Sequence, residues 1–170
     1  MSAPRTNTPD ELLERLDALG IRTTTRHHPP VFTVEESKQL RGELPGGHTK
    51  NLFLKDKKDI LWLVVALEDR VLDMKDLRRR IGSAPLSFGR PELLRAVLGI
   101  EPGSVTPFAL INDTDRQVRV VLDQAMMAID VLNFHPLSNA ATTAIAPKDL
   151  LAFIQSCGHA PMIVDLGGVL

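Results

Sequence analysis

The chain has 170 residues, of which 44% are hydrophobic and 24% charged, the balance of an ordinary soluble domain. Its single cysteine, Cys157, excludes an intrachain disulfide and a four-cysteine zinc site. No apolar run approaches the roughly 20 residues that span a bilayer, and the first ten residues lack the apolar stretch of a secretory signal. The formal net charge of −1 gives no general attraction to nucleic acid. We therefore expect one cytoplasmic domain over residues 1–170, in which any phosphate contact comes from a local patch.

A capping pattern marks the first helix. Thr8 suits the N-cap, Pro9 the first helical position, and Glu11 lies three residues after Thr8 as in a capping box. Leucines at helical spacing follow, and Gly20 predicts the end of the helix. Residues 22–28 are rich in threonine and predict a strand.

A second capping pattern predicts a short helix over residues 33–42, followed by a glycine-rich turn at 42–47. Residues 49–55 and 60–67 then predict a hairpin joined by a tight turn at 56–59. The second strand of this hairpin is apolar on both faces, which is typical of a central strand in a covered sheet.

Shorter elements fill the second half of the chain. Glycines or prolines bound three predicted helices and four predicted strands; the helices are 76–81, 91–98 and 148–157, and the strands are 118–122, 129–134, 140–145 and 162–166. Strands and helices are interspersed without the regular alternation of a doubly wound fold. We therefore predict a mixed α/β (α+β) single domain, with a mixed central β-sheet surrounded by helices. Cys157, within an amphipathic helix, is expected to be a small core residue.

Lys50 and Asn51 follow two adjacent glycines and begin a strand whose neighbour is predicted to be buried. A lysine held at a sheet end can meet a phosphate or a developing oxyanion as a fixed positive charge. A solvated strand-end lysine is the more frequent case when a lysine is taken alone. Lys50 by itself is therefore a weak signal.

The run Gly103–Pro107 (Gly-Ser-Val-Thr-Pro) is a second candidate. Glycine lets the backbone approach a ligand closely, and proline fixes the exit of the loop. Such a loop can aim amide N–H groups at a carbonyl oxygen, as an oxyanion hole requires. The alternative is an ordinary connection between a helix and a strand.

His135 lies in a third polar segment, which continues to Asn139 and Thr142. A histidine beside amide and hydroxyl groups can position a substrate or carry a proton. A structural histidine at a strand end fits the pattern equally well.

The histidines show no metal-binding pattern. His27 and His28 are adjacent and point to opposite faces of a strand, and no pair has the helical spacing of a metalloprotease. A histidine metallohydrolase would need His27, His48 and His135 to converge. Ser104 has no nucleophile-elbow context, so no catalytic triad is indicated. We expect neither a metal nor a cofactor.

The basic clusters are interleaved with acidic residues and predict solvated faces; they are Lys55, Lys57 and Lys58, and Arg78, Arg79 and Arg80. No aromatic residues alternate with these charges, so base stacking is not indicated. No concentrated basic surface of a DNA-binding regulator is predicted.

Three segments together resemble the YbaK/prolyl-tRNA-synthetase-associated editing domains. They are His48–Lys58 (His-Thr-Lys-Asn-Leu-Phe-Leu-Lys-Asp-Lys-Lys), the Gly103–Pro107 loop, and Phe134–Asn139 with Thr142. Within that superfamily the chain looks most like the free-standing ProX type, which deacylates alanyl-tRNA specific for proline. The likeness runs from about Thr8 to Leu166.

The resemblance implies a mixed α/β fold and a pocket without a metal. Lys50 corresponds to the family's lysine, which meets the substrate near the terminal adenosine, and Asn51 to its polar neighbour. Gly103 corresponds to the glycine whose N–H binds the aminoacyl carbonyl, and His135 to a residue that holds the substrate. Further substrate-binding residues suggested by this correspondence are Ser104, Pro107, Asn139 and Thr142. We expect the Lys50 ammonium and the Gly103 amide to converge across one small cavity that holds the acyl ester.

The implied chemistry needs no strong nucleophile, because an aminoacyl ester is already activated. A positioned water and an oxyanion site worth about 3 kcal/mol suffice, and in the family a hydroxyl of the terminal ribose is thought to assist. A synthetase pocket rejects a substrate lacking one methylene by only about 1–3 kcal/mol, so a second pocket that admits alanine and excludes proline is useful. Candidate walls of that pocket are Val34, Leu44, Phe53, Val64 and Phe108.

The expected partners are the acceptor end of tRNA(Pro) and, as a second candidate, prolyl-tRNA synthetase, with no DNA and no membrane. The nearest alternative is a deacylase of cysteinyl-tRNA or of another small aminoacyl-tRNA. An alternative from another class is a non-catalytic module that binds tRNA or a synthetase.

Overall fold

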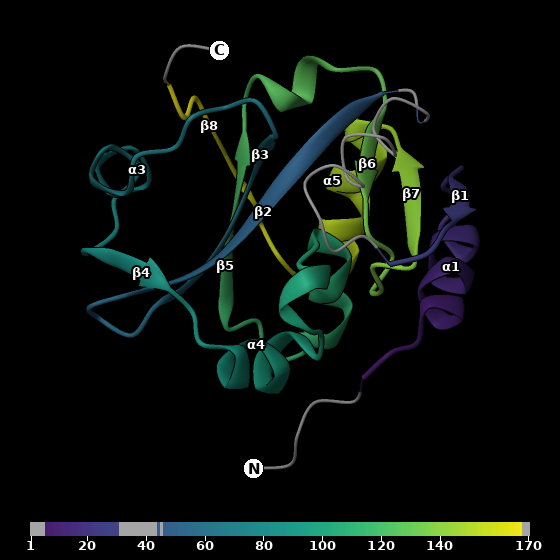
Figure 1. Ribbon diagram of the computed structural model, residues 1–170, viewed down its shortest axis with the longest axis horizontal. Coiled ribbons are helices and arrows are strands. Elements are labelled where there is room, and N and C mark those ends of the chain that lie inside the picture. The colour runs from purple at the N-terminus through teal and green to yellow at the C-terminus, as the bar shows by residue number, and fades with distance from the viewer. Residues whose placement is uncertain (1–5, 31–43, 45, 168–170) are drawn as a thin grey trace.

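The computed structural model of the chain describes residues 6–30, 44 and 46–167. The strands of these residues form one mixed sheet in the order β1-β7-β6-β2-β3-β5-β8, with β4 paired to β2 (Figure 1). Pairs β2–β6, β3–β5 and β5–β8 are parallel and the other pairs are antiparallel. The strands are β1 Thr24–His27, β2 Gly47–Asp56, β3 Leu61–Leu67, β4 Leu86–Phe88, β5 Val118–Asp123, β6 Leu132–Phe134, β7 Ala141–Ile145 and β8 Met162–Val164.

Helices pack around this sheet, so the predicted mixed α/β single domain is confirmed. Figure 1 shows α3 beside β4 and α1 beside β1, at opposite ends of the sheet. No helix among the described residues is long and apolar enough to cross a bilayer. The α-helices are α1 Pro9–Ala18, α3 Met74–Ile81, α4 Pro91–Leu98 and α5 Pro147–Ser156; the 3-10 helices are η1 Pro102–Ser104, η2 Pro107–Asn112 and η3 Met126–Ala128.

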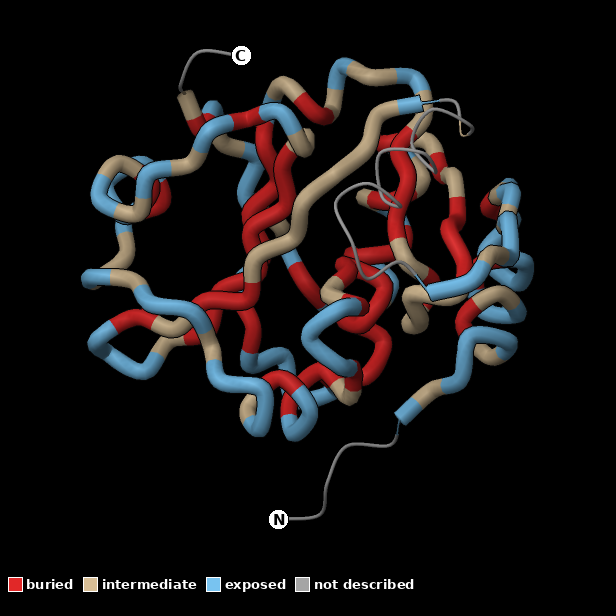
Figure 2. Tube along the Cα trace, in the orientation of Figure 1, coloured by how far each residue is buried: buried red, intermediate tan, exposed pale blue. Residues whose placement is uncertain are grey.

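Strand β3 is buried on both faces, as predicted, and it divides the interior into two cores. From Leu61 to Val65 its odd-numbered side chains join a first core, which includes apolar residues of α1, α4 and α5. From Trp62 to Ala66 its even-numbered side chains join a second core, which is covered by α3. Figure 2 shows β3 buried along most of its length, whereas β2 beside it is largely of intermediate exposure. The sheet therefore has two covered sides.

The predicted start of the first helix is confirmed in atomic detail. Thr8 Oγ1 accepts a hydrogen bond from the N–H of Glu11 at 3.1 Å, and Glu11 Oε1 accepts one from the N–H of Thr8 at 3.2 Å. Helix α3 begins at Met74, earlier than expected, because the side chain of Asp73 caps it by accepting from the N–H of Lys75 at 3.1 Å.

The carboxylate of Asp56 builds the predicted hairpin turn. Its Oδ1 accepts hydrogen bonds from the N–H groups of Lys58 at 2.8 Å and Ile60 at 3.1 Å. Its Oδ2 accepts from the indole Nε1 of Trp62 at 3.2 Å. Asp59 has φ of 62°, a conformation that aspartate tolerates better than most residues. The turn is therefore rigid, and its carboxylate is buried at the end of β2 that lies far from Lys50.

Some predicted elements differ from the structure. Strand β6 begins at Leu132 rather than Ile129, because η3 precedes it and the N–H of Ile129 donates to the carbonyl of Met126 at 3.2 Å. Strand β4 was not predicted, since three residues give no usable period. The short helix expected over 33–42, and most of the 42–47 turn, lie outside the described residues. Cys157 packs, half-buried, against the first core as expected.

A buried polar pair links the end of η2 to the segment after α5. His159 Nε2 lies 2.9 Å from Asp113 Oδ2, and both side chains are almost fully buried. The N–H groups of Gln117 and Val118 also donate to this carboxylate, at 3.0 Å and 2.9 Å. Burial alone would raise the pKa of Asp113, but the hydrogen bonds from His159 and the backbone outweigh it and leave the pKa lowered.

We predict that Asp113→Asn lowers the free energy of unfolding at neutral pH by about 1–3 kcal/mol, because a buried acceptor is lost. A carboxyl whose folded pKa is lowered stabilises the fold above its unfolded pKa, and this contribution disappears as the pH falls through the folded pKa. The difference between wild type and variant should therefore narrow below about pH 4. Urea unfolding across that range measures it; a difference that stays constant with pH would contradict this account.

Candidate active site

A pocket of about 810 Å³ opens where the segment after α4 meets the loop between β6 and β7. Two of the three segments singled out in the sequence meet here: Gly103 and Ser104 come from one, and Asn139 from the other. The lining residues are Thr6, Arg95, Gly99, Ile100, Glu101, Gly103, Ser104, Leu137, Ser138 and Asn139. Residues far apart in the chain therefore form one concave surface.

Helix α4 ends sharply at Gly99, four residues before Gly103. Gly99 adopts φ of 65°, and a Cβ built there would lie 3.1 Å from the side-chain nitrogen of Asn112. That amide donates a hydrogen bond to the carbonyl of Leu98 at 2.9 Å, one of the carbonyls that the end of a helix leaves without a partner. Helix η1 follows, in which Ser104 is buried while Gly103 is exposed to the pocket.

The backbone of Gly103 faces the side chain of Asn139. A Cβ built on Gly103 would lie 3.5 Å from Asn139 Nδ2, which is an ordinary contact, and its φ is not in the left-handed region. Neither backbone strain nor a protein neighbour therefore requires glycine here.

A short loop presents Asn139 to the pocket. Leu137 adopts φ of 67° and packs against the first core, which holds the middle of the loop down. Ser138 Oγ accepts a hydrogen bond from the N–H of Ala140 at 3.1 Å. Both contacts limit the freedom of the loop, so Asn139 has a fixed place opposite Gly103.

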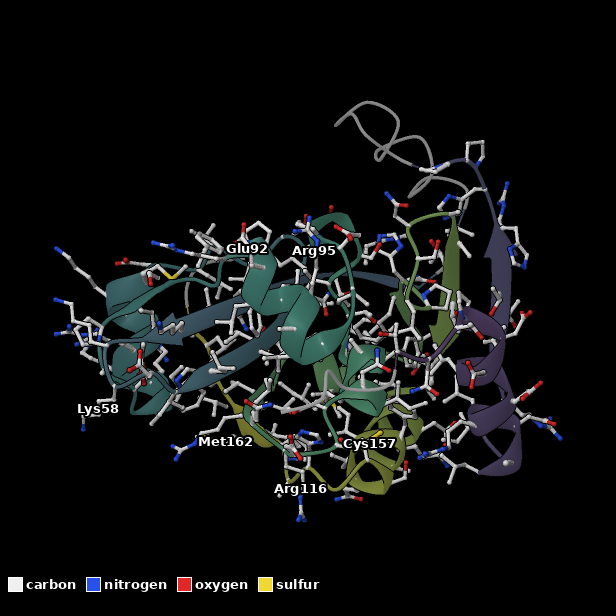
Figure 3. All side chains as sticks on the ribbon, turned by 90° about the horizontal axis from the view of Figure 1, so that it is seen from below. Lys58, Glu92, Arg95, Arg116, Cys157 and Met162 are labelled. Carbon is white, nitrogen blue, oxygen red and sulfur yellow. The ribbon has the colours of Figure 1, made fainter. Side chains whose placement is uncertain are left out.

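Arg95 and Glu101 form an ion pair on the rim of the pocket, which the sequence reading missed. Arg95 Nη2 lies 2.8 Å from Glu101 Oε2, and the hydrogen bond from Arg95 lowers the pKa of the Glu101 carboxyl. Figure 3 shows Arg95 at the surface of α4, near Glu92. The available signal was the pair of opposite charges on either side of the predicted helix stop at Gly99.

His135, Thr142 and His28 form a second polar group beside the end of β6. His135 Nδ1 lies 3.1 Å from the carbonyl oxygen of Ala141, which can only accept, so Nδ1 carries the proton. His28 Nε2 lies 2.9 Å from Thr142 Oγ1. Burial lowers the pKa of His135; the hydrogen bond to the Ala141 carbonyl opposes this shift, and the nearby His28 adds to it, so the pKa remains lowered. His135 is therefore neutral at pH 7, and its Nε2 is an acceptor.

Lys50 and Asn51 lie next to each other on β2 and consequently project to opposite sides of the sheet. Lys50 shares its side with Leu52, a residue packed on the second core, and its Nζ donates to the backbone carbonyl of Arg70. Asn51 lies on the other side, where its Nδ2 is 3.4 Å from Thr49 Oγ1. Its Oδ1 is buried and has no hydrogen-bond partner among the described residues.

The two strands that carry Lys50 and His135 are held side by side. Thr49 Oγ1 donates to the carbonyl of Asn133 at 2.8 Å, and the parallel strands β2 and β6 pair through His48 and Asn133. Lys50 and His135 each follow this last pair by two residues, so both leave the paired segment at the same end. Lys50 therefore lies within β2, beside the point where the chain leaves β6 at His135.

Not every predicted residue joins the pocket. Its lining residues do not include Lys50, Asn51, His135 or Thr142, and Pro107 is buried as the first residue of η2. The predicted convergence of the Lys50 ammonium and the Gly103 amide across one cavity is wrong, because Lys50 projects to the side of the second core. The proposed walls Phe53 and Val64 lie in different cores on opposite sides of the sheet, so they cannot line one cavity. Phe108 is fully buried in the first core. Leu44 contributes its carbonyl, 3.2 Å from His48 Nε2; Val34 lies outside the described residues.

The described histidines, cysteine and carboxylates form no group of three or more that could hold a metal ion. His27, His48 and His135 thus do not converge, as a histidine metallohydrolase would require. The pocket itself offers the Gly103 backbone and the Asn139 amide, whereas the imidazole of His135 and the ammonium of Lys50 lie outside its lining.

Comparisons with known proteins identify the family of the chain. The sequence model of the aminoacyl-tRNA editing domain matches residues 28–153. The prolyl-tRNA synthetase associated domain-containing protein 1 of Mus musculus is 42% identical over 160 residues, covering 91% of this chain and 94% of the relative. The prolyl-tRNA editing protein ProX of Acetoanaerobium sticklandii is 35% identical over 156 residues, covering 91% and 95%.

A solved structure described as a proposed trans-editing enzyme for prolyl tRNA synthetase has the same fold. The two superpose with a TM-score of 0.68 at 21% sequence identity, over 94% of this chain and 98% of the other. The family model and the relatives each cover most of the sequence. The chain therefore belongs to the aminoacyl-tRNA editing domain family.

Proposed function

We propose that the protein is a free-standing editing hydrolase that breaks the ester bond of mischarged alanyl-tRNA specific for proline. The observation that carries the proposal is the pocket, in which Gly103 and Asn139 face one another. Membership of the aminoacyl-tRNA editing family and the prolyl-tRNA editing name of a relative support the substrate class.

The acyl end of the substrate lies in the pocket. The N–H of Gly103 donates to the ester carbonyl oxygen, and its hydrogen bond strengthens as negative charge develops there in the tetrahedral intermediate. Asn139 supplies an amide on the other wall. A water oxygen adds to the carbonyl carbon, the ester C–O bond breaks, and the released ribose hydroxyl takes up a proton, giving alanine and free tRNA.

The nucleotide end of the substrate extends past the end of β6 toward Lys50 on β2. Because Lys50 projects from the other side of the sheet, its ammonium suits the phosphate of the terminal nucleotide rather than the acyl group. His135 lies between these two ends. Its Nε2 accepts a hydrogen bond from a hydroxyl of the terminal ribose and so fixes the orientation of the ester.

Specificity for alanine would rest on the size of the acyl pocket. A deacylation panel with alanyl-, cysteinyl-, seryl- and prolyl-tRNA tests it, and hydrolysis of alanyl-tRNA specific for proline alone is the expected result. Faster hydrolysis of cysteinyl-tRNA would assign the protein to the nearest alternative within the family. Binding of tRNA without hydrolysis of any ester would instead indicate a non-catalytic module.

Replacement of Lys50 tests the nucleotide end. We expect Lys50→Ala to lower kcat/KM for deacylation by about 100-fold or more, because a fixed cation opposite the phosphate is lost. Lys55→Ala is the matched control, since Lys55 lies on the same strand and makes only an exposed ion pair with Asp59 at 3.1 Å. Near wild-type turnover by Lys50→Ala would refute the assigned role.

Replacement of Gly103 tests the acyl end. Gly103→Ala should keep the free energy of unfolding within about 0.5 kcal/mol of wild type, because the new methyl group meets only Asn139 Nδ2 at 3.5 Å. The methyl group does, however, project into the space assigned to the acyl group, so deacylation should fall about tenfold or more. Thermal unfolding and single-turnover deacylation measure the two effects. Full activity of Gly103→Ala would show that the acyl group binds elsewhere.

The pH dependence tests His135. Protonation of Nε2 removes the acceptor, and burial lowers the pKa of His135 from its ordinary value of 6.5. The acid limb of kcat/KM should therefore have its midpoint below 6.5, with full activity retained between about pH 7 and 8. His135→Asn should remove that limb together with most of the activity. A limb that persists unchanged in His135→Asn belongs to another group.

A further inference from the structure

Arg70 and Asp123 form a buried ion pair that the mechanism above does not use. Arg70 is 5% exposed and Asp123 is fully buried. Arg70 Nε donates to Asp123 Oδ2 at 2.9 Å, and its Nη2 donates to Asp123 Oδ1 at 3.3 Å. Two parallel hydrogen bonds fix both the position and the plane of the guanidinium.

The pair joins three segments of the chain. Arg70 closes a turn at the end of β3, where its N–H donates to the carbonyl of Leu67 at 3.0 Å, and Asp123 is the last residue of β5. The N–H of Leu166 donates to Asp123 Oδ1 at 3.3 Å, and Arg70 Nη1 donates to the carbonyl of Gly167. The backbone of Arg70 is thus held from its own amide and from its side chain.

The carbonyl of this restrained residue accepts the hydrogen bond from Lys50 Nζ. A lysine side chain has four rotatable bonds, so a single charge at its end needs an anchor to occupy one place. The backbone oxygen of Arg70 is such an anchor, and the Arg70–Asp123 pair decides where that oxygen lies.

We propose that Arg70 and Asp123 are positioning residues, which hold the ammonium of Lys50 where the substrate phosphate meets it. This inference rests on the proposed function of Lys50. A buried ion pair contributes little net stability compared with well-packed apolar residues. Placing the Arg70 carbonyl, and with it Lys50, is the geometric task that this pair performs.

Conservative variants test the proposal. Asp123→Asn keeps the shape of the side chain, and Arg70→Lys keeps the positive charge; each should lower kcat/KM for deacylation by about 10- to 100-fold through misplacement of Lys50. The matched control is Asp56→Asn, which weakens an equally buried carboxylate at the other end of β2. It should lose comparable stability while kcat/KM stays within about twofold of wild type. An equal loss of rate in the control would overturn the proposal.

A double-mutant cycle separates positioning from a merely structural role. In a Lys50→Ala background, Asp123→Asn should cause no further loss of rate, because its effect acts through Lys50. Multiplication of the two effects would show that the pair acts independently of Lys50 and would overturn the proposal.

A measurement that does not depend on catalysis distinguishes this inference from the proposed function. Acetic anhydride labelling of the folded protein, followed by mass spectrometry, measures the accessibility of the Lys50 amine. Labelling of Lys50 should rise several-fold in Arg70→Lys and Asp123→Asn relative to wild type and to Asp56→Asn, whether or not Lys50 acts on tRNA. Unchanged labelling in both variants would overturn the proposal; full activity of Lys50→Ala with increased labelling would sink only the assigned role of Lys50.

Discussion

The burial of β3 on both faces is the constraint on which the rest of the structure depends. Because consecutive side chains of β3 enter different cores, the sheet cannot expose either face along its middle. Polar groups that must meet a substrate are therefore confined to the ends of the strands and to the loops that follow them. His135 and Asn139 lie in the loop after β6, whereas Lys50 lies within β2, as its fourth residue.

The same constraint separates the site into two parts. Gly103 and Asn139 belong to the side covered by α4 and the first core, whereas Lys50 projects to the side of the second core. In the proposed function, the substrate spans this separation, with its acyl group on one side and a phosphate on the other. Strands β2 and β6, held by the hydrogen bond from Thr49 to Asn133, set the distance between the two parts.

The sequence predicts the local features of this fold well. The capping box of Thr8 and Glu11, the glycine stops after α3 and α4, and the turn at Asp56 all depend on residues within a few positions of one another. Their signals are therefore visible in a single sequence. Most strand and helix positions follow from these signals together with the apolar periods.

Contacts between distant segments leave no signal in a single sequence. Arg70 and Asp123 pair across 53 positions, and Arg95 belongs to the pocket only because α4 ends beside the β6–β7 loop. The selection of Phe53 and Val64 as walls of one pocket failed for a related reason. Each is apolar, but strand pairing places them in separate cores, and only the register of β2 against β3 decides that outcome.

The opposite projection of Lys50 and Asn51 has a consequence for how this segment can vary among related chains. A strand repeats every two residues, so a single inserted or deleted residue between the β6 contact and Lys50 would exchange the two side chains between the sides of the sheet. The ammonium would then face the first core, and the amide would face the Arg70 carbonyl. A change of length in the first half of β2 would thus exchange the two functional candidates, and one in the turn after Asp56 would break the hydrogen bonds that fix that turn.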